Sequence, residues 1–294
     1  PSLTPWSAIN LFAKKSFSDK SESSHFIFFE SRVGYHYKTY EYLFQEGRVL
    51  ATIGAEDGAN STRSFKYYEP RLESRDRLIA NMQTIRDIRI QTRFNLLEDL
   101  RSGSMLSEVT TLDPATQTAN TVIYQYDEQF DEFVHTDERS KKPHTSDFLK
   151  DYFDSEDNIR ARFVLFDDTT RVPKGEGTKY NEIMPRRVSS FGMMNRITVT
   201  ATIYGRNDLF VGDMIHIDLP QFKAATESTE VNRNLSGFWL IKSMNHVMKE
   251  TVWDSHLILV KDSYRGEGDN PESKYTIKNK INDGVDKLNK LESK

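Results

Sequence analysis

Cysteine is absent from all 294 residues of the chain. Without thiols the protein has neither disulfides nor thiolate metal sites, which fits a reducing compartment without requiring one. Long hydrophobic runs are absent too: no stretch approaches the roughly 20 apolar residues that a membrane span needs, and no signal peptide is visible. We therefore expect no membrane partner.

Recognisable catalytic motifs are also missing. The chain contains no Gly-x-Ser-x-Gly turn, phosphate loop, dinucleotide fingerprint or His-Glu-x-x-His. The acidic run DYFDSEDN (151–158) lacks the alternating ligands, central glycine and terminal glutamate of a calcium loop. No pair of carboxylates is singled out for glycoside hydrolysis. We expect a protein that is not an enzyme, with no catalytic residues, no cofactor and no bound metal.

Neither sign of charge dominates, because 40 basic and 44 acidic side chains leave a net charge of only −4. This balance argues against a general nucleic-acid binder, which needs a basic surface. Arginines are densest between residues 63 and 101, but acidic residues alternate with them there. Such mixed charge favours a solvated or subunit-contact surface over a nucleic-acid site. The chain opens with Pro1 instead of methionine, so we expect it to be the later portion of a longer polypeptide.

The first 62 residues predict a helix, a hairpin and a second helix. Thr4 is a suitable N-cap with Pro5 in the first turn. Strands at 25–30 and 34–39 flank a glycine-containing turn. A short helix is expected to begin at Glu41 and end near Gln45. The hairpin aromatics are compatible with base stacking, but aromatic residues are common in any strand.

The middle of the chain predicts a mixed α/β domain. Strands are expected at 63–68 and 84–94, with a helix at 71–79 between them. Asn95 should cap a helix at 96–101, with Gly103 in its C-terminal turn. A hairpin at 105–112 and 120–126 follows, and residues 127–160 are acidic.

Strict alternation of side chains marks the last part of the chain. Residues 197–203 alternate isoleucine, valine and alanine with threonine, a period of two that indicates a strand. Further strands are expected at 213–219, 237–247 and 251–260, and we expect strands 195–205 and 213–219 to pair as an antiparallel hairpin. Together they predict a barrel or sandwich. A helix should begin at Pro185, and the polar loop 221–236 should be mobile.

The chain ends in a predicted linker and helix. The linker begins at Ser263 and contains glycine and proline. One narrow apolar stripe follows on a single helix face; it consists of Ile277, Ile281, Val285, Leu288 and Leu291. Gly284 weakens this helix by about 1 kcal/mol relative to alanine. We expect the stripe to contact a neighbouring subunit or another protein, with its own subunit as the alternative.

These patterns predict an α+β protein in four segments. Residues 1–62 form the small α/β unit, 63–160 the mixed domain, 161–262 an antiparallel β domain, and 263–294 the linker and helix.

A family resemblance rests on three stretches of sequence, which are typical of a fold and contain no catalytic motif. They are FIFFESRVGYHYKTYEYL (26–43), LFVGDMIHIDLP (209–220) and SGFWLIKSMNHV (236–247). In these stretches, and in element order over residues 1 to about 262, the chain resembles the baseplate hub proteins of contractile-tail bacteriophages, which are related to the hub part of type VI secretion spikes.

The resemblance implies a structural protein with tube-type β domains. Hub proteins are trimers that adapt the hexameric tail tube to the trimeric central spike, so the implied partners are two further copies, the tube protein, the spike protein and other baseplate proteins. DNA would only pass through the channel. The implied location is the virion, after assembly in the host cytoplasm. A second tube-type domain is not visible in this sequence.

Two further expectations follow from the resemblance. Thr198, Thr200 and Thr202 would line the channel of the ring, and the trimer contacts would come from the tube-type domain and segment 63–101. The alternative function is a β-barrel module that binds single-stranded nucleic acid or a polysaccharide, because Val-Gly-Asp before a strand also occurs in such barrels.

Overall fold

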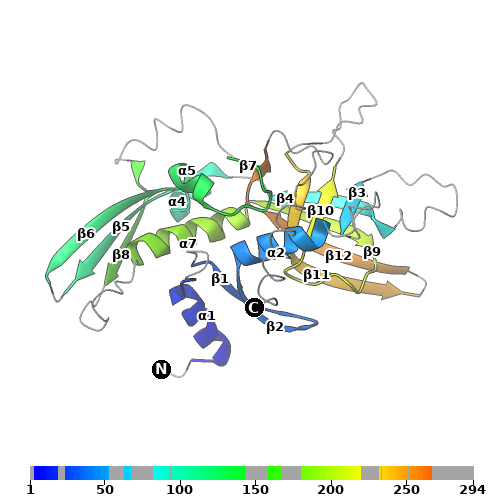
Figure 1. Ribbon diagram of the computed structural model, residues 1–294, viewed down its shortest axis with the longest axis horizontal. Coiled ribbons are helices and arrows are strands. Elements are labelled where there is room, and N and C mark those ends of the chain that lie inside the picture. Colours follow the sequence, from blue (N-terminus) through cyan, green and yellow to red (C-terminus); the bar gives the residue numbers. More distant parts are fainter. Residues whose placement is uncertain are drawn as a thin grey trace, which may run out of the picture.

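The computed structural model describes residues 3–18, 24–52, 63–67, 82–92, 95–114, 116–142, 158–166, 180–219, 232, 234–250 and 252–266. A closed β-barrel lies at one end of the molecule and a three-stranded sheet at the other, with helix α7 running between them (Figure 1). The predicted α+β class is therefore confirmed. The predicted helix 71–79 lies outside the described residues.

The elements have the following bounds. The helices are α1 Pro5–Lys15, α2 Tyr40–Thr52, α4 Leu96–Ser102, α5 Tyr126–Gln129 and α7 Tyr180–Met194, with the 3-10 turn η1 Phe130–Glu132. The strands are β1 Phe26–Ser31, β2 Gly34–Thr39, β3 Ser64–Tyr67, β4 Thr84–Thr92, β5 Leu106–Asp113, β6 Thr118–Gln125, β7 Ser140–Lys141, β8 Ala161–Phe166, β9 Ile197–Tyr204, β10 Met214–Asp218, β11 Gly237–Lys249, β12 Val252–Lys261 and β13 Tyr264–Arg265.

The N-terminal unit has the predicted order of helix, hairpin and helix. Thr4 caps α1 by accepting the Ser7 N–H at 3.3 Å, and β1 pairs antiparallel with β2. The predicted end of α2 at Gln45 is wrong, because the helix continues to Thr52. Gly47 does not end it: a Cβ there would lie 2.6 Å from Met214 Cγ. This glycine is needed for close packing of α2 on β10, so tertiary contact overrides its low helix propensity.

The barrel strands follow the order β10-β11-β12-β9-β4-β3 and close on themselves. The predicted hairpin between strands 195–205 and 213–219 is wrong, because β9 pairs with β12 and β4 while β10 pairs with β11 and β3. Residues 205–213 form a connection far longer than a two-residue hairpin turn, so it can cross the barrel end. The pairings of β3 with β10 and β4 are parallel.

Alternation along β9 decides which side chains fill the barrel. Ile197, Val199, Ala201 and Ile203 are buried inside it together with Trp239. Because β3 and β4 belong to the same barrel, residues of segment 63–160 and segment 161–262 share this core. The barrel is thus assembled from chain regions far apart in sequence.

The second sheet has the order β6-β5-β8, with β5 antiparallel to β6 and parallel to β8. The caps of α4 are confirmed: Asn95 accepts the Glu98 N–H, and Gly103 adopts a left-handed φ of 77°. The predicted start of helix α7 at Pro185 is wrong, because the helix begins at Tyr180. Its first turn carries a tertiary hydrogen bond, in which the Ser24 hydroxyl donates to the Ile183 carbonyl at 3.1 Å.

Candidate assembly site

The barrel sheet has two partly open edges. Strand β4 pairs with β9 along its length, but β3 covers it only at Thr84 and Ile85. Strand β11 pairs with β12 along its length, but β10 covers only residues 237–240. Residues 86–92 of β4 and 242–249 of β11 therefore face no second strand among those that the structure describes. Exposed edges of this length offer unpaired N–H and C=O groups to another chain.

Both edges border the same four-stranded layer, β11-β12-β9-β4, in which they are the outermost strands. In Figure 1, β11 and β12 extend past the short barrel strands β3 and β10. The layer is held across its strands by Arg86, which pairs with Asp254 on β12 and lies 5.1 Å from the Tyr204 ring centroid. This cross-strand contact is not readable from sequence, since it depends on which strands are neighbours.

The three threonines predicted to line a channel lie on the outer face of β9, opposite the barrel core. Thr200 and Thr202 are half-buried, and Thr198 is buried. Thr202 Oγ1 lies 3.0 Å from His256 Nδ1 on β12, and Thr198 donates to the Asn195 carbonyl at 3.3 Å. The structure thus gathers them on one polar face of the layer. Their role as a channel lining stays a prediction.

The structure describes only some of the other residues that were predicted to lie in an interface. The stripe Ile277, Ile281, Val285, Leu288 and Leu291 lies outside the described residues, as does nearly all of loop 221–236. In segment 63–101, several charges form pairs within the chain. Arg89 Nε lies 3.0 Å from Asp87 Oδ2, and Arg63 lies 3.4 Å from Asp213.

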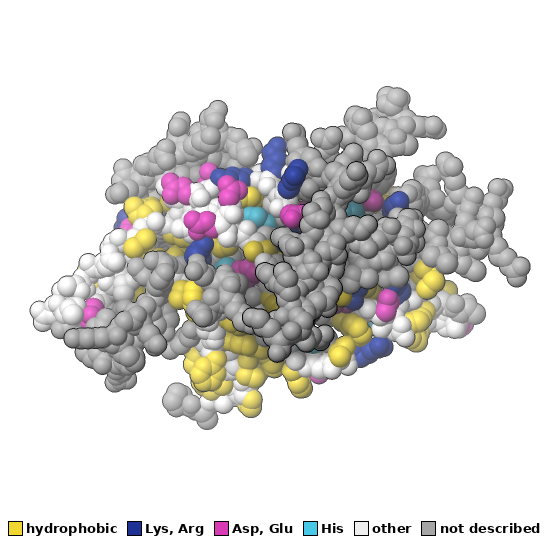
Figure 2. Space-filling view, in the orientation of Figure 1, with side chains coloured by type: hydrophobic (Ala, Val, Ile, Leu, Met, Phe, Trp, Pro, Cys, Tyr) yellow, Lys and Arg dark blue, Asp and Glu magenta, His cyan; other side chains and the backbone are white. Residues whose placement is uncertain are grey.

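A second exposed surface covers α1 and the β1–β2 hairpin, and we call it the aromatic flank. It consists of Leu3, Trp6, Leu11, Phe12, Phe17, Val33, Tyr35 and Tyr37. Figure 2 shows hydrophobic side chains gathered at the lower edge of the molecule, where Figure 1 places α1. Exposed apolar patches of this kind mark interaction surfaces.

Ring packing explains how the aromatic flank arises. On one hairpin face Phe26 stacks on Tyr37 and Phe28 on Tyr35, at centroid distances of 4.9 and 5.8 Å. Helix α1 covers this face only in part, through Trp6, whose ring lies edge-on to Phe28 at 4.9 Å. Phe12 and Tyr35 remain 66% and 69% exposed. The sequence showed the aromatic strands, but the incomplete cover by α1 is a tertiary feature.

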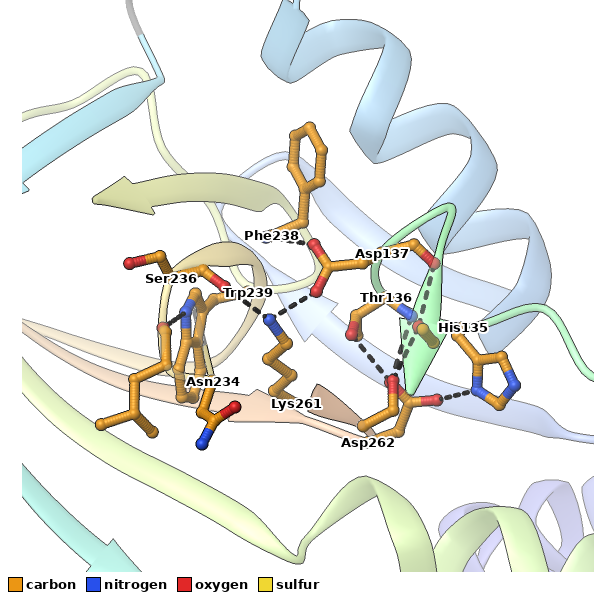
Figure 3. Close-up of polar contacts among 12 residues, drawn as sticks. His135, Thr136, Asp137, Asn234, Ser236, Phe238, Trp239, Lys261 and Asp262 are labelled. Atoms are coloured by element: carbon orange, nitrogen blue, oxygen red, sulfur yellow. Dashed lines mark hydrogen bonds and ion pairs between the residues drawn. The ribbon is translucent and has the colours of Figure 1, made fainter. Parts of the chain in front are cut away.

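A buried polar network fastens the segment after η1 to the barrel (Figure 3). Lys261, with no exposed surface, pairs with Asp137 and donates to the Ser236 carbonyl at 2.9 Å. Asp137 also accepts the Phe238 N–H at 2.8 Å. The close approach needs glycine at 237, where φ is 119° and a Cβ would lie 2.5 Å from Asp137 Oδ1. The ion pair between Lys261 and Asp137 was not predicted from the sequence. The one indication of it there is a lysine at the end of the apolar strand β12.

Next to it, His135 and Asp262 form a second buried pair (Figure 3). His135 Nδ1 lies 2.7 Å from Asp262 Oδ2, and Nε2 lies 2.8 Å from the Phe130 carbonyl oxygen. Thr136 donates to the other carboxylate oxygen through its N–H at 3.1 Å and its hydroxyl at 2.7 Å. Both ring nitrogens thus face acceptors, which favours the doubly protonated imidazolium.

The electrostatics of this pair agree with its geometry. Burial alone lowers the pKa of His135, but the charge and hydrogen bond of Asp262 and the Phe130 carbonyl outweigh it and raise that pKa above its ordinary value. Burial raises the pKa of Asp262, yet the His135 charge and the hydrogen bonds from His135 and Thr136 bring it down to about 2. Because each buried charge has its partner, the network acts as a structural clamp.

The described part of the chain contains neither a cluster of metal-ligand side chains nor a helix that could span a membrane. Within it, no group of three or more histidine, aspartate or glutamate side chains is placed to hold a metal ion. The helices found in the same residues are too short or too polar to cross a bilayer.

Comparisons with known proteins give distant structural likenesses and no match to a family model or a curated protein. Among solved structures, the chain is similar to the tail protein from Neisseria meningitidis MC58, with a TM-score of 0.32 and 12% sequence identity. The match covers 68% of this chain, and the chain spans only 44% of that protein's length.

Proposed function

We propose that the protein is a structural subunit of a phage tail, and that it acts as a baseplate hub without catalysis. In this proposal three copies form a ring that adapts the hexameric tail tube to the trimeric central spike. The observation that carries it is the pair of open edges, β4 and β11, on the two sides of one barrel layer. The resemblance of stretches 26–43, 209–220 and 236–247 to hub proteins supplies the family context.

The two edges supply a mechanism for ring formation. Residues 86–92 of one copy would pair with residues 242–249 of the next through backbone hydrogen bonds, as in β-augmentation. Such a contact joins two different surfaces, so it is head-to-tail, and it gives a closed ring when the rotation between copies closes. The polar face with Thr200 and Thr202 would then belong to the ring wall, and DNA would pass through as cargo.

Further partners follow from the same proposal. The ring would contact the tube protein on one side and the spike protein on the other, and other baseplate proteins around it. The aromatic flank lies on a different element from the sheet edges, so it is free to bind one of these proteins while the ring is closed. The protein would be assembled in the host cytoplasm and reside in the virion.

The mass in solution at micromolar concentration tests the ring. We expect three times the subunit mass. Permanent subunit contacts commonly bury about 2,000 Å² or more, so a trimer held by them should persist at this concentration. The measurement should be made alone and with the spike or tube protein, because a partner can be required for assembly. A monomer under both conditions contradicts the hub proposal.

Hydrogen exchange then identifies the contact. Backbone amides of residues 86–92 and 242–249 that point away from their paired strands should be protected in the trimer and exchange quickly in the monomer. A trimer in which both edges still exchange quickly shows that the ring closes through another surface.

The second candidate, a module that binds single-stranded nucleic acid, is favoured by one observation. Tyr35 and Tyr37 are exposed on the hairpin, each stacked on a phenylalanine, as in base-stacking platforms. A salt titration against single-stranded nucleic acid separates the two functions. Binding that falls steeply with salt supports the module, whereas no binding at low salt supports the assembly role.

A further inference from the structure

An apolar pocket of about 170 Å³ lies between β1, α2, the end of α7 and strands β11 and β12. Its walls are formed by Ile27, Phe29, Leu43, Met194, Leu240 and Val260. An engineered apolar cavity of about 150 Å³ holds a benzene molecule. The pocket is therefore large enough for one aromatic ring or a short alkyl chain.

One positive charge lies at this pocket. Lys242 lines it together with Asn195, and Lys242 Nζ donates to Asn195 Oδ1 at 2.7 Å. Asn195 Nδ2 in turn donates to the Phe191 carbonyl at 3.1 Å, which turns the amide oxygen toward the ammonium. No carboxylate in the part of the chain that the structure describes is within ion-pair distance of Lys242. An ammonium held by a neutral amide beside apolar walls has hydrogen-bond donors left for an anion.

Tyr40 adds a neutral polar group to the same wall. Burial raises the pKa of its hydroxyl to about 12, while the Arg187 charge lowers that pKa to a smaller extent and the Glu41 charge raises it. The hydroxyl therefore stays protonated at neutral pH and brings no negative charge to the pocket. Among the lining residues that the structure describes, Lys242 is the one that carries a charge at neutral pH.

We propose that this pocket binds an aromatic or short aliphatic group that carries a carboxylate. The apolar part enters between Phe29, Leu43 and Leu240, and the carboxylate pairs with Lys242. The ligand is either a free small acid or the C-terminal residue of a polypeptide, since both present the same chemistry. Lys242 is the one pocket residue that also belongs to an open sheet edge, residues 242–249 of β11, and no residue of the aromatic flank lines the pocket. The proposal does not depend on the proposed role in a tail.

Calorimetric titration with 3-phenylpropionate tests the charge preference. We expect a dissociation constant on the order of 1 mM, as suits a small ligand. The matched alcohol, 3-phenylpropanol, should bind about fivefold more weakly, because an ion pair with an exposed lysine contributes modestly. The matched amine, 3-phenylpropylamine, should bind more weakly still. Equal affinity for all three, or no binding of the acid, overturns the proposal.

Three variants locate the binding. Lys242→Met should reduce the affinity for the acid to that for the alcohol, while Lys141→Met, a matched change at an exposed lysine on β7 that does not line the pocket, should leave it unchanged. Val211→Trp should fill the pocket from its lining loop and abolish binding of both. Methyl resonances of Met194 and Leu240 should shift on titration in the wild-type protein. Binding that leaves these resonances unmoved, or that survives Val211→Trp, overturns the assignment.

The source of the ligand is decided by comparing three compounds. These are 3-phenylpropionate, a tetrapeptide ending in phenylalanine with a free carboxylate, and the same peptide as its C-terminal amide. Tighter binding of the free-carboxylate peptide than of the small acid assigns the pocket to a polypeptide end, and the reverse order assigns it to a free acid. If the amide binds as tightly as the free-carboxylate peptide, the role of the carboxylate is refuted.

Discussion

Lys261 lies fully buried beside the Trp239 ring, 5.7 Å from its centroid, and depends on Asp137 for its charge partner. Removing a charge of this size from water is costly, so the pair is favourable only while both members are present. Through Asp137, the pair holds the segment that follows η1 against the start of β11. At the scale of single residues, this contact joins the barrel to the rest of the molecule.

Replacing Lys261 with methionine should lower the free energy of unfolding by about 3–5 kcal/mol, because Asp137 is left buried and unpaired. Urea denaturation of the two proteins measures this difference. Lys249→Met, on an exposed strand position, serves as the control and should stay within about 0.5 kcal/mol of the wild type. A loss below about 1 kcal/mol for Lys261→Met would mean that the pair is not desolvated as the structure shows.

The His135–Asp262 pair predicts a defined pH dependence. Because the folded-state pKa of His135 is raised, its stabilisation is fully present below the unfolded pKa of about 6.5 and is lost as the pH rises through the folded value. Because the pKa of Asp262 is lowered to about 2, its stabilisation is present above about 3.9 and is lost as the pH falls through that lower value.

The variant His135→Gln isolates the histidine contribution. The difference in unfolding free energy between wild type and variant should be largest from about pH 5 to 6.5 and should shrink toward pH 9. Besides Asp262, Asp131 also raises the pKa of His135. The variant Asp131→Asn should therefore lower that pKa slightly, so that the stabilisation by His135 is lost at a slightly lower pH. A difference that is constant from pH 5 to 9 shows that His135 is not charged in the folded protein.

At the scale of elements, α1 and the hairpin carry an apolar surface that folding does not use. Phe12 on α1 is 66% exposed, whereas Phe44 on α2 is 2% exposed in the core shared with β10 and β11. Phenylalanine thus packs in the core on α2 but is exposed to solvent on α1. Burial decides which of them contributes to folding.

Phe44→Ala should lower the unfolding free energy by about 3–5 kcal/mol through cavity formation. Phe12→Ala should change it by less than about 1 kcal/mol, since little of its surface is withdrawn from water. Denaturant unfolding measures both. The Phe12 variant should also bind less of a hydrophobic dye. If Phe12→Ala destabilises as much as Phe44→Ala, the aromatic flank belongs to the core.

At the scale of the whole molecule, the predicted C-terminal stripe would give the proposed hub a further contact. Deleting residues 267–294 should leave the melting temperature and the trimer mass unchanged, and should weaken binding to another baseplate protein. Differential scanning calorimetry and a pull-down with purified baseplate proteins measure the two effects.

Matched point variants in the full chain provide the control. Ile281→Ser with Leu288→Ser should reproduce the deletion, and Lys280→Ser with Lys287→Ser should not, because the lysines lie off the stripe. A loss of several degrees in melting temperature on deletion of residues 267–294 assigns the stripe to the chain's own core.

The sequence by itself determined those local features whose signals act over a few residues, although the end of α2 and the start of α7 were not among them. Thr4 and Asn95 mark helix starts through capping, Gly103 marks a helix end, and the alternation of β9 separates its core face from its threonine face. These features depend on backbone geometry and on hydrogen bonds within one turn or strand, so they are readable without the fold.

Only the tertiary structure decided which strands are neighbours and which charges meet. The two open edges of the candidate site exist because β9 lies between β12 and β4, and because β3 and β10 are too short to cover β4 and β11. The pairs of Lys261 with Asp137 and of Asp262 with His135 join residues more than a hundred positions apart. Such contacts arise from competition among many distant pairings for one core, and a periodic pattern within a single strand carries no information about its outcome.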